Sequence, residues 1–384
     1  MSLQKREHTL SIWLFATAYF LFYAPYSALT KAITSGHAGG GRPLSGFELL
    51  PSTVLVTAIV MLAFVSVMGW WKDAGRRSLL GVSVPFPRVE TAVSGIAFAI
   101  IIMTTTLAFT FSGISIVFAL LLMRAGVLIL SPLVDHFYER RVRWFSWVGL
   151  TLSVSALIVA FGSVHSYKVG AVATLNLAAY LTGYLFRLPC MTRVAKTRDV
   201  HAVYGYFAEE QLVAMPALVI LPALVALIGN GSVMHDLRLG FMDVLHARDF
   251  VTTGYLIGLC YAGLGIFGTL VYLDRRENTF CVPLNRCSSV LSGFVASYAL
   301  ALLVPTRAVN SSEVVATSLL ITALLVMSPL HHLPLYIKQI KDAVAERRLV
   351  VFNFARIDAG NPERPPSVIT VDLQAVRRVL EKRP

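Results

Sequence analysis

The chain has 384 residues, of which 56% are hydrophobic and only 14% are charged, and its mean hydropathy is +0.69. Soluble domains typically carry about a quarter charged residues, so the composition excludes an ordinary soluble protein. The apolar residues come in repeated runs of about 20, the length that a helix needs to cross a bilayer. The ten-residue alternating segments of a membrane β-barrel are absent. The sequence therefore predicts an all-α, polytopic membrane protein.

The net charge of +12 would also fit a nucleic-acid-binding protein, but membrane topology accounts for it better and no nucleic-acid partner is expected. The four cysteines share no C-x-x-C spacing and all lie in apolar runs: Cys190, Cys260, Cys281 and Cys287. Neither a disulfide framework nor a zinc site is predicted, and no metal or cofactor is expected.

Ten apolar runs are predicted to be transmembrane helices. They cover residues 9–33, 47–71, 91–111, 114–134, 144–162, 169–188, 205–229, 250–272, 279–304 and 313–335. The run at 9–33 follows Lys5 and Arg6 like a signal peptide, but it is too long for a typical signal sequence and is interpreted as a retained first span.

The lysines and arginines predict the orientation. With the N-terminus in the cytoplasm, 25 of the 33 fall on cytoplasmic segments, 6 on outside loops, and Arg124 and Arg286 inside spans. Short loops rich in Lys and Arg stay in the cytoplasm. We therefore predict that both termini are cytoplasmic, that loops 34–46 and 230–249 lie outside, and that the membrane is a bacterial cytoplasmic one.

A shift of 162 residues brings the two halves into register. Arg124 then falls on Arg286, Glu48 on Glu210, and the span edges also match. Each half has five spans, an odd number, so the second copy must cross the membrane inverted. We predict a first repeat at 1–165, an inverted repeat at 166–336 and a basic cytoplasmic tail at 337–384. In the tail, residues 338–348 are expected to continue the last helix into the cytoplasm. For the rest of the tail, a loosely ordered solvated end is expected, and the alternative is a short amphipathic helix at 373–380 on the membrane surface.

The block between the fourth and fifth spans carries a family resemblance. An Arg-containing span closes with Glu139-Arg140-Arg141, and the next span starts with Phe145-Ser146-Trp147-Val148-Gly149. Over residues 9–335 the chain resembles the EamA-type branch of the drug/metabolite transporter superfamily. It departs from that pattern in its long loop at 32–46, in its tail and in a degenerate second copy of this block. The resemblance implies a ten-helix secondary transporter for a small solute.

Arg124 and Arg286 are the strongest functional signal, because a charge inside a span is costly and is retained for a structural or functional purpose. Arg124 lies in the middle of its span, whereas Arg286 lies nearer the cytoplasmic end. They are predicted to bind the substrate. Tyr23, Tyr180 and Tyr184, and also Tyr19, are candidate aromatic walls of that site, and the alternative for these tyrosines is a lipid-facing or core position. The alternative for Arg124 is a structural contact with Asp135, Glu48 or backbone carbonyls.

Glu48 and Glu210 are candidates for proton coupling, since a buried carboxylate can titrate during transport. The alternative is an interfacial carboxylate or a charge at a helix start. The run Gly263-Leu-Gly265-Ile-Phe-Gly268 matches a dinucleotide fingerprint but lies inside a span, where small residues allow close helix packing.

No catalytic residues are predicted. Glu209-Glu210 resembles the start of an intramembrane-protease motif, but Ala214 stands where that motif has its Arg, and no Walker motif is present. The prediction is a secondary transporter of a small metabolite, slightly favouring an anionic or zwitterionic solute, in contact with membrane lipids, as a monomer or homodimer. Two alternatives remain: a flippase for a lipid or lipid-linked sugar on the same scaffold, and a non-transporting membrane scaffold or sensor.

Overall fold

The computed structural model of the protein describes most of the chain, with gaps. The described residues are 12–37, 42–79, 82–108, 116–162, 171–197, 199–244, 248–303, 311–327, 348–352 and 368–372. Within them the fold is all-α, as predicted, with eleven α-helices and two small two-stranded sheets.

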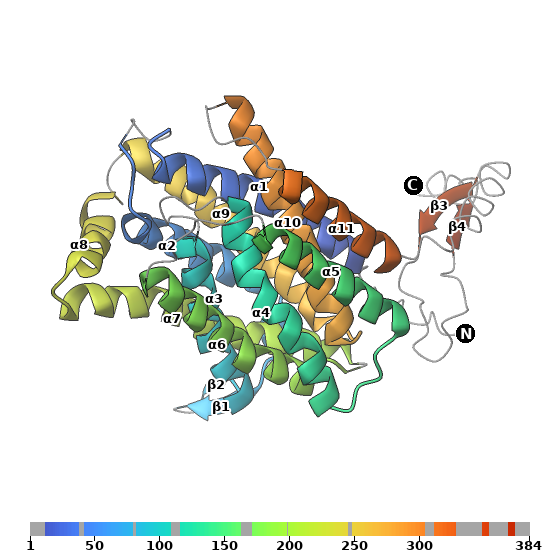
Figure 1. Ribbon diagram of the computed structural model, residues 1–384. Helices are drawn as coiled ribbons and strands as arrows, with labels where there is room; N and C mark the ends of the chain where they lie inside the picture. The colour runs from blue at the N-terminus through green and yellow to red at the C-terminus, as the bar shows by residue number, and fades with distance from the viewer. Residues whose placement is uncertain are drawn as a thin grey trace.

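Ten of these helices are long, and each overlaps one of the predicted spans. In the first half they are α1 (Ile12–Thr34), α2 (Gly46–Val67), α3 (Val89–Ala108), α4 (Ile116–Phe137) and α5 (Trp144–Gly162). In the second half they are α6 (Ala171–Val194), α7 (Val200–Ile228), α9 (Arg248–Leu273), α10 (Asn278–Leu303) and α11 (Ser311–Met327). They pack into one bundle (Figure 1).

Five helical segments of the described chain are long and apolar enough to cross a membrane: Ile12–Thr34, Gly46–Val67, Val89–Ala108, Val200–Ile228 and Phe250–Leu273. Large apolar side chains on the outer surface of the bundle, such as Leu21 and Ile59, are more than half exposed. Such surfaces suit a lipid environment. The chain is a multi-pass helical membrane protein.

Two connections between helices contain secondary structure that the sequence did not predict. The predicted loop at 230–249 contains a short helix, α8 (Ser232–Leu239), and a π-helical turn, η2 (Gly240–Val244). After the 3-10 turn η1 (Trp70–Lys72), the strands β1 (Arg76–Leu79) and β2 (Val82–Pro85) form an antiparallel hairpin in the connection between α2 and α3. These elements are eight residues or shorter, too short for an apolar run of membrane-spanning length to reveal them.

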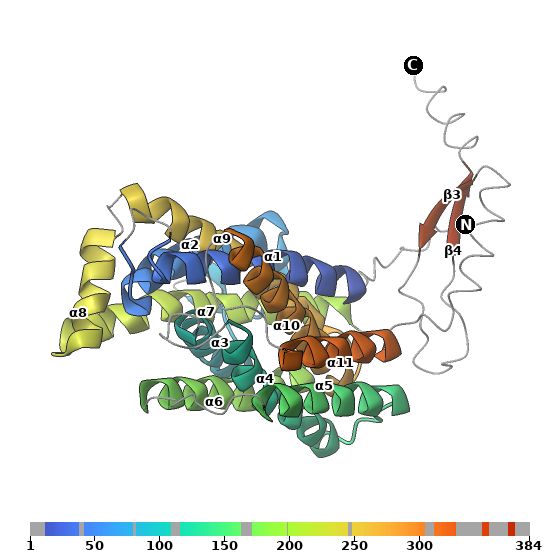
Figure 2. The same cartoon turned by 45° about the horizontal axis from the view of Figure 1, so that its top comes forward.

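The tail also contains strands. β3 (Arg348–Phe352) and β4 (Val368–Asp372) pair antiparallel, and they lie outside the helical bundle in both views (Figures 1 and 2). The expected tail helix at 338–348 reaches Arg348, which instead begins β3. The rest of that helix and the alternative helix at 373–380 lie outside the described residues.

The helix contacts follow a pattern that is nearly unchanged when the halves are exchanged. Adding 162 to the bounds of α4 gives 278–299, and α10 occupies Asn278–Leu303. If each helix is replaced by its counterpart in the other half, the α1–α9 contact becomes α6–α3 and the α2–α9 contact becomes α7–α3. All four contacts are present. α4 contacts its counterpart α10, and α5 contacts α11.

The glycines of the fingerprint-like run hold α9 close to α1, as predicted for small residues. A Cβ added to Gly263 would lie 2.6 Å from the Phe22 ring of α1, and one added to Gly268 would lie 2.9 Å from the Tyr19 ring. These distances are too short for non-bonded carbon atoms. The two glycines therefore set the separation of α1 and α9.

Gly263→Ala tests this close approach. Alanine at a helix interior position would stabilise by up to about 1 kcal/mol through propensity, whereas overpacking against Phe22 costs about 1–3 kcal/mol. We expect a net loss of stability in detergent-solubilised protein, measured by thermal unfolding. Gly231→Ala is the control: its Cβ would be 3.5 Å from Met234 Sδ, an ordinary contact, and should change little. A more stable Gly263→Ala protein would contradict the packing role.

Candidate functional site

Two helices each present a row of buried tyrosines, which in α6 ends in an arginine, to the centre of the bundle. α1 carries Tyr19, Tyr23 and Tyr26 at spacings of four and three residues, which places them on one helical face. α6 repeats this spacing with Tyr180, Tyr184 and Arg187. All six side chains are buried. The faces of α1 and α6 therefore supply hydroxyl groups to the interior.

Arg124 of α4 reaches both rows. Its side chain is 2% exposed, and its two Nη atoms donate hydrogen bonds to the hydroxyl oxygens of Tyr180 and Tyr23. The guanidinium carbon also lies 5.5 Å from the centre of the Tyr23 ring and 5.7 Å from that of Tyr180. Hydroxyl oxygens and ring faces thus replace the water that Arg124 would bind at a surface.

Arg286 of α10 meets Arg124 at the same tyrosine. Its Nη1 donates to Tyr180 Oη over 3.0 Å, and its guanidinium carbon lies 4.6 Å from the centre of the Tyr184 ring. The structure therefore brings together all five predicted substrate-binding residues: Arg124, Arg286, Tyr23, Tyr180 and Tyr184.

Neither arginine forms an ion pair with a carboxylate of the described residues. Asp135, the first alternative partner of Arg124, caps the start of α10: it accepts hydrogen bonds from the backbone N–H groups of Asn278 and Thr279 over 2.9 and 2.6 Å. Glu48 is paired with Arg42 instead. The structural alternative for Arg124 therefore reduces to its contacts with tyrosines.

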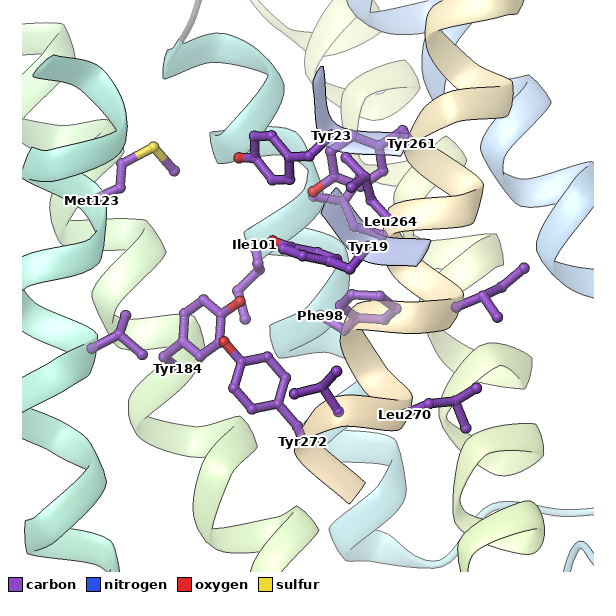
Figure 3. Packing of buried hydrophobic residues seen from close by; sticks show 14 of the residues in the cluster. Tyr19, Tyr23, Phe98, Ile101, Met123, Tyr184, Tyr261, Leu264, Leu270 and Tyr272 are labelled. Atoms are coloured by element: carbon purple, nitrogen blue, oxygen red, sulfur yellow. The ribbon is translucent and has the colours of Figure 1, made fainter. Parts of the chain in front are cut away.

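Tyr272 and Asn285, which are not among the predicted site residues, belong to the same cluster. Tyr272 donates a hydrogen bond to Asn285 Oδ1 over 3.0 Å, and its ring centre lies 6.0 Å from that of Tyr184. Figure 3 shows Tyr184 and Tyr272 facing each other from α6 and α9. Tyr272 stands at the end of a predicted span, where sequence alone does not distinguish a buried tyrosine from an interfacial one.

Arg187 is a third buried arginine. It is one of the 25 lysines and arginines that the sequence predicts on cytoplasmic segments, and this prediction is wrong for Arg187, which lies inside α6 and is 1% exposed. Its Nε and Nη2 donate to the two carboxylate oxygens of Glu210 over 2.9 and 2.8 Å. Its position one turn after Tyr184, on the same helical face, is the sequence signal that would have identified it.

The two candidate proton-coupling carboxylates occupy different surroundings. Glu48 lies in the first turn of α2 and forms a capping box with Ser45, which fits the alternative of a helix-start charge. Glu210 is fully buried inside α7; besides Arg187 it accepts hydrogen bonds from the hydroxyls of Ser94 (2.6 Å) and Tyr206 (3.2 Å). A role for either in proton coupling stays a prediction.

A small cavity of about 30 Å³ lies between these side chains, enough for about two water molecules. Arg124 and Arg187 both contribute to its wall, and α9 contributes Gly265 and Gly268. The other wall residues are Tyr19, Tyr23, Phe98, Ile101, Thr105, Tyr184, Tyr261, Leu264, Thr269, Tyr272 and Asn285. This volume is well below the several hundred Å³ that sites for small organic ligands typically have.

The connections at one end of the bundle tie the two halves together. Arg143, before α5, donates to Glu277, before α10, over 2.8 Å, and Ser146 donates to the same carboxylate over 2.6 Å. Burial acts to raise the pKa of Glu277, but the hydrogen bonds and charge of Arg143 and the Ser146 hydroxyl outweigh it, so that the pKa lies below its ordinary value. The carboxylate is thus held in its charged, paired form.

The same end contains further ties between the halves. Glu209 of α7 is fully buried and accepts hydrogen bonds from the backbone N–H groups of Gly75 and Arg88, and from the Thr91 hydroxyl. It therefore anchors the β1–β2 hairpin and the start of α3. These contacts give Glu209 a structural role at the connection between α2 and α3.

Within the described residues no group of three or more His, Cys, Asp or Glu side chains is placed to hold a metal ion. The chemistry that the central cluster offers is therefore hydrogen bonding and positive charge, from guanidinium and tyrosine hydroxyl groups.

Comparisons with known proteins add little to this geometry. No protein-family model matches the chain. No curated protein sequence matches it. One solved structure, a crystal structure of a protein with 15% sequence identity, is similar with a TM-score of 0.47 over 83% of this chain and 99% of the other.

The Arg187–Glu210 pair predicts a measurable coupling. Glu210→Gln leaves the buried Arg187 without a counter-charge, and we expect it to lower the free energy of unfolding by about 3–5 kcal/mol. Arg187→Met in the same protein should recover most of that loss, because no unpaired charge is then buried. Denaturant unfolding of both single variants and the double variant in detergent gives the coupling energy. Simple additivity of the two single effects would contradict the pairing.

Proposed function

We propose that the chain is a secondary transporter that carries a small anionic or zwitterionic solute between its two halves. The observation that carries this proposal is the pair of buried arginines, Arg124 and Arg286, which have no carboxylate partner among the described residues and meet at Tyr180. Burying a charge without a counter-charge is costly, and such a charge in a membrane protein is retained mainly for function. A negatively charged solute that enters from either side supplies the missing charge.

The proposed scaffold has ten transmembrane helices, α1–α7 and α9–α11, in two inverted five-helix repeats. Three observations support it. Each long helix of the first half overlaps its counterpart after a shift of 162 residues, the helix contacts keep nearly the same pattern when the halves are exchanged, and Arg124 and Arg286 occupy equivalent positions on α4 and α10. A site between inverted repeats is the arrangement that secondary transporters use for alternating access. The resemblance to EamA-type transporters agrees with this plan.

In alternating access, the contacts between the connection before α5 and the connection before α10 would act as one of two gates. Arg143–Glu277 and the Asp135 cap of α10 join the first half to the second. On the predicted topology these connections face the cytoplasm, so the cytoplasmic gate is closed in this conformation. Opening it exchanges the paired groups for water, which costs little once they are hydrated.

The topology predicts opposite reporter signals. Fusions at His37 and at Pro384 should report the outside and the cytoplasm respectively, because Lys and Arg concentrate on the segments assigned to the cytoplasm. Correcting the position of Arg187 removes one residue from the cytoplasmic count and leaves the bias intact. Alkaline phosphatase and green fluorescent protein fusions measure the two locations. The same signal at both positions would exclude ten spans.

The transport proposal predicts that replacing Arg124 lowers the flux of the solute but leaves the stability of the protein unchanged. Arg124→Leu should stay folded, because no carboxylate of the described residues loses its partner, and should reduce flux at least 100-fold. Arg124→Lys keeps the charge but cannot hydrogen bond both Tyr23 and Tyr180 with a planar fork, so its flux should fall about tenfold. Counterflow of labelled lactate, glutamate, succinate and glycerol 3-phosphate in proteoliposomes measures flux, and thermal unfolding measures stability.

Arg193→Leu is the matched control for these variants. Arg193 lies in the last turn of α6, is mostly exposed and pairs with Glu90 over 3.6 Å. Losing such a surface pair costs less than about 1 kcal/mol, so flux should be kept. A stable Arg124→Leu protein with normal flux would show that this arginine does not contact the solute.

A further inference from the structure

The two arginines of the central cluster converge on a single oxygen atom. Arg124 Nη1 and Arg286 Nη1 both donate to Tyr180 Oη. Two donors on one oxygen lie within about 6 Å of each other, given ordinary hydrogen-bond lengths. Two like charges that close repel each other. The tyrosine hydroxyl separates the guanidiniums but, being neutral, cannot compensate their charge.

Three buried N–H groups of these guanidiniums have no hydrogen-bond partner among the described residues. They are Nε of Arg124, and Nε and Nη2 of Arg286. Both side chains are at most 2% exposed. Arg187, by contrast, uses Nε and Nη2 on Glu210, with Nη2 also reaching Thr269 over 2.8 Å. The neighbouring site is thus complete, whereas the Arg124–Arg286 site lacks two negative charges and several acceptors.

The geometry selects among possible anions. One carboxylate would compensate only one of the two charges. A dicarboxylate places its two charges at opposite ends of a carbon chain, whereas these guanidiniums point at one oxygen. A tetrahedral phosphoryl group carries a charge of about −1.5 to −2 and three acceptor oxygens on one atom. It can accept from both arginines through different oxygens, and bidentate Arg–phosphate contacts are among the strongest hydrogen-bonded pairs.

We propose that Arg124 and Arg286 together bind one compact dianionic oxyanion, the phosphoryl group of a phosphate monoester, which takes the place of the Tyr180 hydroxyl. This inference rests on the proposed function, since it names the class of solute at the same site. Tyr180 is then a placeholder: its hydroxyl accepts from both guanidiniums when the site holds no solute and moves aside when the oxyanion enters. The surrounding rings of Tyr19, Tyr184 and Tyr272 contact the organic part.

Binding to the full-length protein in detergent tests the inference without requiring transport. Isothermal titration with methyl phosphate, sulfate, succinate and acetate is performed at equal ionic strength, at pH 7.5 and pH 5.0. Methyl phosphate should bind at least tenfold more weakly at pH 5.0, because it loses its second charge with a pKa of about 6. Sulfate, a tetrahedral dianion at both pH values, should bind similarly at both. Succinate and acetate should bind at least tenfold more weakly than methyl phosphate at pH 7.5.

Three variants separate binding from folding. Arg286→Gln should weaken methyl phosphate binding at least tenfold, while Arg193→Gln, a surface control, should not. Tyr180→Phe should tighten binding several-fold, because no hydroxyl then competes with the oxyanion for the guanidiniums. If Tyr180 instead donates a hydrogen bond to the solute, Tyr180→Phe should weaken binding. Thermal unfolding of each variant confirms that the protein measured is folded.

The outcomes distinguish this inference from the transport proposal. Tighter binding of succinate than of methyl phosphate, or no binding of any anion to folded protein, would overturn the phosphoryl assignment. Arg124-dependent counterflow of another solute would still leave the transport proposal standing in that case. Binding of methyl phosphate as expected, with no flux of glycerol 3-phosphate in proteoliposomes, would support the site and contradict transport.

Discussion

The centre of this bundle is governed by the cost of placing guanidinium groups away from water. An arginine in the middle of a membrane-spanning helix costs roughly 2.5–3.5 kcal/mol on insertion scales, and Arg124 and Arg286 are both almost fully buried. Tyrosine hydroxyls and ring faces from α1 and α6 reduce this cost. α4 and α10 carry the charges, so four helices must converge at one point. The two halves of the chain meet at that point.

The contrast between two neighbouring sites indicates which is structural. Arg187 and Glu210 compensate each other with bidentate hydrogen bonds, and Ser94 and Tyr206 occupy remaining acceptor positions of the carboxylate. A site satisfied in this way gains nothing from a ligand. Arg124 and Arg286 have only neutral partners and keep unused donors. The unbalanced pair, rather than the balanced one, is therefore the site where an anion would lower the energy.

Sequence reasoning identified the features that stand out locally. Arg124 and Arg286 interrupt apolar runs, and the ten long helices follow from run lengths, so both were predictable. Arg187 was missed because it lies near the end of a predicted span, where a charge normally belongs to a loop. Its partner Glu210 is 23 residues away, and only packing of α6 against α7 joins them. The β1–β2 hairpin and the Glu209 contacts depend on such long-range packing as well, and so left no periodic signal.

The positions of the polar contacts also constrain how the halves can move. At one end, Arg143–Glu277 and the Asp135 cap join α4 and the start of α5 to the start of α10, all at connections between helices. In the middle, Tyr180 joins α4, α6 and α10 through two arginines. A solute that displaces the Tyr180 hydroxyl would remove one of the central links between the halves, while the contacts between the helix connections remain. Binding at the centre would therefore loosen the bundle first where the arginines lie, and separation of the helix connections would require their ion pairs to break in addition.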